Sequence, residues 1–562
     1  MVLFKEAKNP EKLKEIRENP FYSENLARIH EVYEDIKDKP IEVMTKSEYF
    51  IFHETGNRLI FERKYFERRT RLDIYFIMYL LYEREEDLKR LEDVIWAICG
   101  EFSWSLPAHV HWEDAMEDMV FIDLFAAETG QTLSEILYIL EDKLSDYIKS
   151  IMRYEINRRI IEAFKNHTYY WETVTNNWAA VCAGSVGMTF IYCAPEQFES
   201  VEQRIMSAMD SFLSGYGDDG VCTEGLGYWS YGFGYYTYFA ELLYDFSDGK
   251  KDIMHTDKIR EIAQFQQRVY LSGNTVASFA DGGRYGNFEA GLTHRLKDLF
   301  PDCVTVPDNQ YAKKDFLGME NRFAMCIRTL LWTKPEYAET GSDTVCEKYY
   351  PTAQWYINKN PLFGFAAKCG RNNEPHNHND IGNFIIASGS KQLIADIGSG
   401  EYTKDYFNDK KRYEILCCSS QGHSVPLIDG HAQSFGNEYS GKVLSYGNNE
   451  FIIDIEGAYA SDTLAKAVRA FKISGNSVSV KDEFEFTDNG THEIRERFIS
   501  LIEPEVRADG IYIENMRILC NVKAEITKDT DNDHSGKAFP VWEIDYVTSD
   551  KNFEIEFVIR SL

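Results

Sequence analysis

The chain has 562 residues and a formal net charge of −30. This length is enough for two or three domains with sizeable cores. The negative charge argues against a general nucleic-acid or anionic-membrane binder, because both activities depend on clustered Lys and Arg side chains.

The first residues, MVLFKEAKNPEKLKEI, contain no apolar signal region, and no apolar run in the chain approaches the length of a membrane span. The eleven cysteines are odd in number and show neither a CxxC metal spacing nor a paired framework. We therefore expect a reduced, cytoplasmic protein that binds no membrane. A signal sequence removed from the chain would instead make it periplasmic or secreted.

The first half of the chain is predicted to be helical. Segments such as NLARIHEVYEDIKDK and LEDVIWAICGEF repeat apolar residues at spacings of three and four. Within residues 113–164, Gly130 is expected to stop one helix, and Thr132 with Glu135 is expected to cap the next. Successive helix pairs without a strict sequence period favour a helical toroid or solenoid over residues 1–315.

The second half is predicted to be an all-β domain over residues 316–562. Short runs rich in β-branched and aromatic residues alternate with Gly, Asn and Asp turns. In VSVKDEFEF, Val478, Val480, Phe484 and Phe486 alternate with polar residues, as in a strand with one buried face. A region this large favours a two-layer antiparallel supersandwich over a single β-sandwich.

Polar residues gather around one predicted buried strand in EPHNHNDIGNF. His376 and His378 lie two residues apart, so an extended backbone would project both to the same side. Asp396 and His423 follow at the ends of later predicted strands. Two interpretations remain open: these side chains make hydrogen bonds at strand ends, or His378, Asp396 and His423 hold a zinc ion.

Two further clusters lie in the helical half. Asn176 and Asn177 head a helix rich in small residues, where an amide caps the helix or binds a substrate carboxylate. Downstream, Glu224 precedes a helix on which Tyr228, Tyr231 and Tyr235 share one face. The loop WSLPAHVHW either lines a cleft or closes a turn; its candidate binding residues are Trp104, His109 and His111.

Other chemistries fit less well. The sequence has no P-loop, no dinucleotide fingerprint after a strand and no G-x-S-x-G nucleophile elbow. We therefore expect no organic cofactor.

Taken in this order, five motifs resemble the heparinase II/III-like polysaccharide lyases: NNWAAVCAGS, DDGVCTEGLGYWSYG, EPHNHNDIGNF, LIADIGSGEY and GHSVPLIDG. The resemblance spans roughly residues 104–430. It implies an incomplete (α/α) toroid followed by an antiparallel β-sandwich or supersandwich, with the active site between them. It also implies β-elimination at a uronic acid in an acidic polysaccharide or oligosaccharide, either glycosaminoglycan-like or alginate-like.

The resemblance also implies roles for individual residues. Asn177, or its neighbour Asn176, matches the amide that neutralises the uronate carboxylate. Tyr228 and His376 match the catalytic tyrosine and histidine, although Tyr231 or Tyr236 could replace Tyr228 as the acid. The implied structural zinc shell is His378, Asp396 and His423. The predicted substrate contacts are Asn176, Glu224, His109, Trp104, Tyr231 and Arg371.

The sequence departs from the family pattern at two points. Trp178 stands where some relatives have histidine, and the missing signal sequence favours imported oligosaccharides as substrates.

Two alternative functions are considered. One is a glycoside hydrolase that uses Glu224 with Asp218 or Asp219, and the other is a non-catalytic carbohydrate-binding protein. The particular uronate, endo or exo action, and homo-oligomerisation are left open by the sequence.

Overall fold

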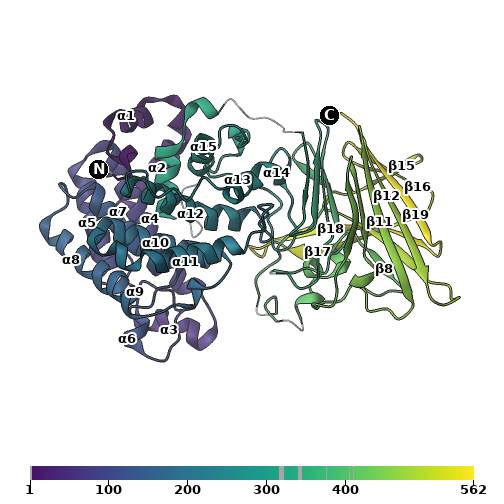
Figure 1. Ribbon diagram of the computed structural model, residues 1–562, viewed down its shortest axis with the longest axis horizontal. Helices are drawn as coiled ribbons and strands as arrows, with labels where there is room; N and C mark the ends of the chain where they lie inside the picture. Colours follow the sequence, from purple (N-terminus) through teal and green to yellow (C-terminus); the bar gives the residue numbers. More distant parts are fainter. Residues whose placement is uncertain are drawn as a thin grey trace.

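The computed structural model describes residues 3–314, 322–338, 345–374, 376–403, 405–408 and 411–561. Helices gather at one end of the molecule and antiparallel sheets at the other (Figure 1). The expected order, a helical region followed by β-sheets, is therefore confirmed.

The α-helices cover most of the region before residue 333. They are α1 (Pro10–Glu18), α2 (Ser23–Ile36), α3 (Lys46–Thr55), α4 (Leu59–Tyr82), α5 (Glu85–Cys99), α6 (Ala115–Asp118), α7 (Leu124–Ile139), α8 (Asp146–Ile156), α9 (Glu162–Asn166), α10 (Asn177–Cys193), α11 (Phe198–Ser214), α12 (Leu226–Phe246), α13 (Asp257–Ala263), α14 (Phe265–Val269), α15 (Ala290–Leu299) and α16 (Phe323–Trp332).

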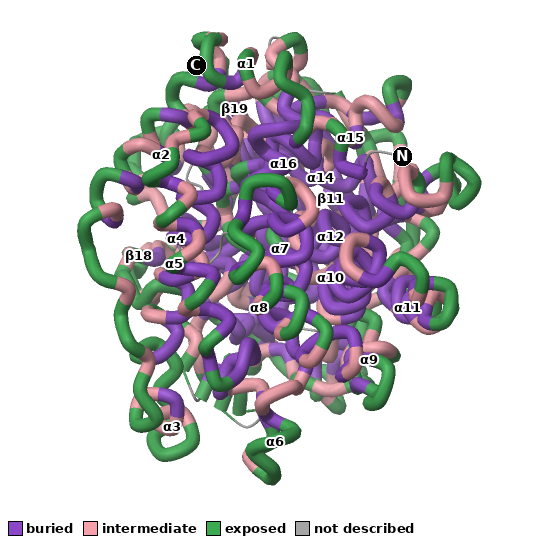
Figure 2. The backbone as a smooth tube through the Cα atoms, turned by 90° about the vertical axis from the view of Figure 1, so that its left-hand side faces the viewer, coloured by how far each residue is buried: buried purple, intermediate pink, exposed green. Residues whose placement is uncertain are grey.

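The centre of the helical region is formed by α7, α10, α12 and α16, which are largely buried, whereas exposed backbone lies at the rim (Figure 2). Small residues allow this close packing. A Cβ atom on Gly187 of α10 would lie 2.5 Å from the ring of Phe239 on α12. A larger residue at this position would therefore force the two central helices apart.

Gly130 does not stop a helix, contrary to the expectation from sequence. It lies inside α7, where an added Cβ would come within 2.5 Å of the Ile160 side chain. The glycine is required by packing, and its local helix-breaking tendency is overridden.

The helical region also extends beyond the expected boundary at residue 315. Helix α16 packs with α15, α4 and α7, so it belongs to the helical region. The first strand of the large sheets begins only at Cys346.

Three antiparallel sheets form the second region, beside a small β1–β2 hairpin (Tyr270–Ser272 and Thr275–Val276) in the first. A five-stranded sheet holds β3 (Cys346–Tyr350), β4 (Trp355–Lys359), β5 (Gly364–Lys368), β6 (Phe384–Ser388) and β7 (Lys391–Ile394). An eight-stranded sheet has the order β14 (Glu505–Arg507), β15 (Gly510–Ile513), β16 (Met516–Cys520), β19 (Asn552–Ile559), β12 (Ser477–Phe486), β11 (Leu464–Ser474), β10 (Glu450–Asp454) and β9 (Lys442–Gly447). A four-stranded sheet has the order β17 (Ala524–Asn532), β18 (Ala538–Thr548), β13 (Ile494–Ser500) and β8 (Pro426–Ile428).

The five-stranded sheet is a middle layer. On one face, Phe365 and Phe384 pack against Phe471 of the eight-stranded sheet, with ring centroids 5.3 Å apart in each pair. On the other face, residues such as Ile357 and Ile385 belong to the core of the helical region. Burial on both faces explains why β4, β5 and β6 are buried at every position.

Strand β12 shows the predicted alternation, with Val478, Val480 and Phe484 buried, although Phe486 at its end is only partly buried. Among the described helices, none is by itself both long and apolar enough to cross a membrane. The pair Asn177–Cys193 and Pro195–Ser214, bent by 118°, passes that test of length and composition only when the two are counted together.

Candidate active site

Tyr228 and His376 meet where the helical and sheet regions adjoin. Tyr228 lies in the first turn of α12, and His376 lies in the loop between β5 and β6. Their rings stack with centroids 5.4 Å apart and planes inclined by 27°. His376 has a left-handed backbone conformation, with φ of 56°, which costs a non-glycine residue free energy and is common at functional sites. Two of the three predicted catalytic residues are thus in contact.

The predictions from sequence missed the carboxylate at the centre of this cluster, Asp281. Its Oδ2 atom lies 2.7 Å from Nδ1 of His376, and its Oδ1 atom lies 3.0 Å from Nε2 of His378. Arg412 donates to Oδ1 at 3.1 Å, and the hydroxyls of Tyr402 and Tyr406 also donate to the carboxylate. Burial favours the protonated form of Asp281, but the histidine hydrogen bonds and the Arg412 charge outweigh it and hold the pKa far below its ordinary value.

Glu224 and Tyr228 surround the free edge of the His376 ring. Oε1 of Glu224 lies 3.7 Å from Nε2 of His376. Burial raises the pKa of Glu224, and the neighbouring His376 side chain opposes this effect. Burial, followed by the charges of Glu224 and Asp281, raises the pKa of Tyr228. The tyrosine therefore keeps its proton at neutral pH and is suited to act as an acid.

The two asparagines at the head of α10 have different surroundings. Asn176 is the N-cap, and its side chain accepts a hydrogen bond from the backbone N–H of Trp178 at 3.1 Å. Asn177 is buried, and a Cβ atom on Gly232 of α12 would lie 3.2 Å from its Cα atom. Gly232 follows Tyr228 by four residues, so both lie on one face of α12. Asn177 therefore packs against α12 about one helical turn after Tyr228.

The other candidate tyrosines are occupied elsewhere. The hydroxyl of Tyr236 donates to the backbone carbonyl of Ile253 in a buried contact, which removes this residue as an alternative acid. Tyr231 donates to Oε1 of Glu128 at 2.7 Å, inside the helical region. Tyr228 is the member of the set that contacts His376.

The structure contradicts one predicted substrate contact. Trp104 is buried in the helical core and donates its indole N–H to the carbonyl of Ile98, so its ring cannot stack on a sugar. His109, in the same loop, is held by Asp123 at 2.7 Å and contacts the Trp178 ring at 5.0 Å, next to Asn177.

Arg371 is exposed, and its backbone pairs with Ser440 in the β region. Its role as a substrate contact stays a prediction.

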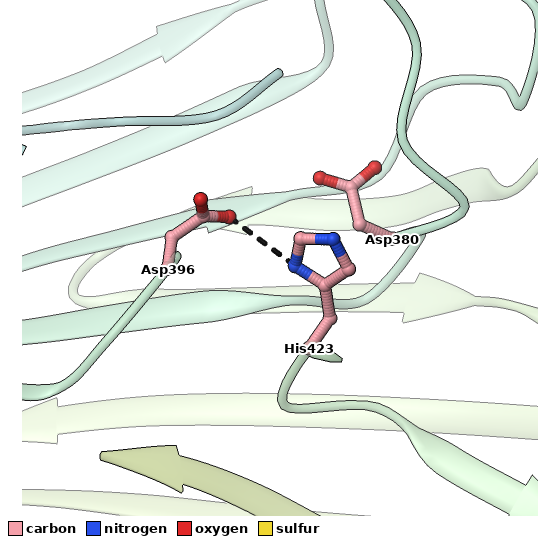
Figure 3. Close-up of side chains that lie close together, drawn as sticks. All are labelled: Asp380, Asp396 and His423. Atoms are coloured by element: carbon pink, nitrogen blue, oxygen red, sulfur yellow. Dashed lines mark ion pairs between the residues drawn. The ribbon is translucent and has the colours of Figure 1, made fainter. Parts of the chain in front are cut away.

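A second cluster lies beneath these residues and contains two of the three predicted zinc ligands. Ligand atoms of Asp380, Asp396 and His423 lie within 4.8 Å of one another, and all three residues are buried (Figure 3). Nδ1 of His423 is 3.4 Å from Oδ2 of Asp396. The sequence analysis named His378 in place of Asp380. The ring of His378 lies beside the cluster, with its centroid 5.3 Å from that of His423.

The hydrogen bonds fix which nitrogen of each histidine faces this cluster. Nε2 of His423 lies 2.8 Å from the carbonyl oxygen of Cys417, so Nε2 carries the proton and Nδ1 presents a lone pair. Nε2 of His378 is held by Asp281, and the His378 side chain also interacts with that of Cys418. Oδ2 of Asp380 is buried without a hydrogen-bond partner among the described residues, while Oδ1 accepts from the Lys368 ammonium at 2.6 Å.

The carboxylate pair expected for a hydrolase is not formed. Asp219 accepts hydrogen bonds from the backbone N–H groups of Val221 and Thr352, which commits it to holding a turn. Asp218 is exposed to solvent. The nearest carboxylate to Glu224 across His376 is Asp281, which already accepts five hydrogen bonds.

Residues 346–538 match the model of a protein family described as Heparinase II/III-like, C-terminal. The overall fold is similar to that of a heparan sulfate lyase HepC mutant from Pedobacter heparinus, with a TM-score of 0.62, 11% identity, and coverage of 98% of this chain and 91% of the other. A structure of heparinase III has a TM-score of 0.60 and 14% identity, covering 92% of this chain and 79% of its own. A chondroitin AC lyase mutant from Streptomyces coelicolor A3 has a TM-score of 0.54 and 9% identity, covering 100% and 83%.

A search of curated protein sequences finds no match. The overall fold is the helical-then-sheet fold of these lyase structures. Over residues 346–538, the chain matches the heparinase II/III-like C-terminal family model. The resemblance and fold class drawn from the sequence motifs are thus confirmed, and the matches agree with the expected enzyme class, a polysaccharide lyase.

Proposed function

We propose that the protein is a polysaccharide lyase that cleaves a uronic-acid-containing polysaccharide or oligosaccharide by β-elimination. The observation that carries this proposal is the contact between Tyr228 and His376, with Asp281 behind the histidine. This arrangement supplies an acid and a base, and Asn177, packed against the same helix as Tyr228, supplies a neutral donor. It supplies no opposed pair of free carboxylates, which a glycoside hydrolase would need.

The elimination requires one proton to be removed and one to be supplied. Because Asp281 accepts the Nδ1 proton of His376, Nε2 of the histidine can remove the C5 proton of the uronate. The electron pair forms the C4–C5 double bond, and the bond from C4 to the glycosidic oxygen breaks. Tyr228 donates its proton to the departing oxygen, and proton exchange then restores both side chains.

The uronate carboxylate must be stabilised while negative charge develops beside it. The buried amide of Asn177 can donate to this group. Arg284, on the same loop as Asp281, lies over the ring of Phe539 at 4.4 Å, and its Nη1 atom has no hydrogen-bond partner among the described residues. This guanidinium is a candidate contact for a further anionic group of the substrate.

The test is a continuous ultraviolet assay against uronic-acid polysaccharides and their oligosaccharides. β-Elimination produces a double bond conjugated to the carboxylate, so we expect absorbance to rise with at least one substrate. New reducing ends without absorbance would instead indicate hydrolysis, and binding without either product would indicate a carbohydrate-binding protein. The panel includes heparan-type, chondroitin-type, hyaluronan and alginate chains, because the geometry of the site does not distinguish them.

We further propose a structural zinc ion at the Asp380–Asp396–His423 cluster. Imidazole nitrogen and carboxylate oxygen suit zinc, and Oδ2 of Asp380 is a buried polar atom without a hydrogen-bond partner among the described residues. Asp396, His423 and either His378 or Asp380 would hold the ion, with the Lys368 ammonium balancing the second carboxylate. A bound ion would tie β6, β7 and the segment before β8 together beneath the site.

We expect about one zinc ion per chain in protein purified without chelators, measured by elemental analysis. His423→Ala should lose the metal and lower the midpoint of thermal unfolding. His492→Ala is the matched control, because His492 also lies between two carboxylates, at 2.7 Å from Asp429 and from Asp488, but far along the chain from the cluster. Metal-free native protein, or equal zinc in the His423 and His492 variants, would refute the zinc proposal.

A further inference from the structure

The carboxylate of Asp281 joins the two regions of the protein at the candidate active site. Asp281 lies on the loop between β2 and α15, in the helical region, whereas its five hydrogen-bond donors all lie within residues 376–412. Residues 398 and 399 of the sheet region also hold this loop, through the residue that follows Asp281. The backbone N–H of Ser399 donates to the carbonyl of Gly282 at 3.3 Å, and a Cβ atom on Gly398 would lie 2.4 Å from that same oxygen.

Each oxygen of Asp281 serves one histidine. Oδ2 accepts from Nδ1 of His376 and from the Tyr402 hydroxyl at 3.2 Å. Oδ1 accepts from Nε2 of His378, from Arg412 and from Tyr406. A carboxylate offers about four lone-pair sites, so five donors leave none for a substrate. Asp281 therefore orients other groups and does not itself exchange protons with the sugar.

The carboxylate holds two histidines that are two residues apart, each through a different ring nitrogen. A histidine whose one nitrogen donates to a carboxylate presents the lone pair of its other nitrogen in the opposite direction. For His376, that free nitrogen is Nε2, which faces Glu224 at 3.7 Å. The ring of His378 lies beside that of His423, and its side chain also interacts with that of Cys418.

We propose that Asp281 is the positioning residue of the site: its carboxylate fixes the Nδ1-protonated tautomer of His376 and holds the ring of His378 in place through Nε2. The proposal rests on the proposed lyase function and adds a residue to it. The backbone on both sides of the key hydrogen bond is constrained, since Ala280 has φ of 59° and His376 has φ of 56°. Tyr402 extends the arrangement, because its hydroxyl hydrogen-bonds both Asp281 and Tyr228. One carboxylate thereby orients the base directly and the acid through a second tyrosine.

Asp281→Asn tests the proposal with little change in shape. The asparagine amide keeps only one acceptor oxygen, and its N–H₂ group replaces the other oxygen. The N–H₂ group cannot accept a hydrogen bond from a ring N–H or a hydroxyl, so Asp281 can no longer fix the orientation of both histidines. We expect kcat to fall about 10³- to 10⁴-fold, as when an aspartate that orients a catalytic histidine is replaced by asparagine. KM should change by less than about threefold, because Asp281 does not contact the substrate. Asp252→Asn is the control: it alters the exposed Asp252–His255 hydrogen bond of 2.6 Å, remote from the site.

A spectroscopic measurement separates positioning from general damage. In protein labelled with ¹⁵N only at histidine, the resonances of His376 are identified by their absence in His376→Gln, and the spectrum at alkaline pH reports the neutral tautomer. We expect Nδ1-protonated His376 in the wild type and a changed tautomer in Asp281→Asn. An Nε2-protonated His376 in the wild type would overturn the proposal even where the variant does not fold. An Asp281→Asn enzyme that keeps more than half of its kcat would also overturn it.

The two proposals fail in different ways. A wild-type protein inactive on every uronate would refute the lyase assignment, while the wild-type tautomer would still decide whether Asp281 positions His376. An active wild type with an equally active Asp281→Asn variant would refute the role of Asp281 alone.

Discussion

Tyr228→Phe is expected to lower kcat about a thousandfold, within the range that a general acid contributes to catalysis. The substitution removes the hydroxyl that protonates the departing oxygen. It leaves the ring that stacks on His376, so the affinity for an oligosaccharide, measured by calorimetry, should change little. Initial rates from the ultraviolet assay give kcat.

Tyr244→Phe is the matched control, because Tyr244 lies on the same helix, α12, with its ring partly exposed and away from His376. Its kcat should stay within about twofold of the wild type. If Tyr228→Phe retained wild-type kcat, Tyr228 would have no part in the reaction. If it lost oligosaccharide binding together with activity, its role would be in binding and not in proton transfer.

Arg469→Met is expected to lower the free energy of unfolding by about 3–5 kcal/mol. The guanidinium of Arg469 is fully buried on β11 and pairs with Asp482 of β12 and Glu496 of β13, each at 2.8 Å. It also donates to the carbonyls of Gly382 and Ser424, which lie in the loops carrying the candidate metal ligands. Methionine fills the volume but leaves a buried carboxylate without its partner. Urea denaturation followed by tryptophan fluorescence measures the loss.

The double variant Arg469→Met with Asp482→Asn separates charge from packing. Removing the unpaired charge should recover part of the stability lost in Arg469→Met, because an uncompensated buried carboxylate is the main cost. A double variant less stable than the single variant would mean that packing around Arg469, and not its charge, dominates. A single variant within about 1 kcal/mol of the wild type would show that the network contributes little.

The order of the two regions could be predicted from sequence because helices and strands have different apolar periods. The strand pattern of Val478, Val480 and Phe484 depends on one buried face, and the structure has that face. Gly130 could not be interpreted correctly in the same way. Its place inside α7 is required by contact with Ile160, a residue thirty positions away, which no local pattern contains.

Within the candidate site, too, residues in distinctive local motifs could be predicted and residues defined by distant contacts could not. Tyr228 and His376 could be identified because each lies in a distinctive local motif. Asp281 could not, since FADGGRYG reads as an ordinary turn and its partners lie about a hundred residues later in the chain. The place of Asp380 beside Asp396 and His423 has a similar cause. The spacing of His376 and His378 predicts a shared side, and both do contact Asp281, but the approach of Asp380 to Asp396 and His423 depends on the fold of later segments.

The five-stranded sheet has a consequence for how the protein divides into units. Its inner positions Ile357, Ala366, Ile385 and Ala387 complete the core of the helices, while its opposite face completes the core of the larger sheet. A cut in the chain between residues 333 and 345 would leave each fragment with a broad unsatisfied apolar surface. The family model begins at residue 346, but the segment that starts there is not expected to fold without the helical region. The helical and sheet regions share a continuous apolar boundary, so the relative position of Tyr228 and His376 is set when the chain folds.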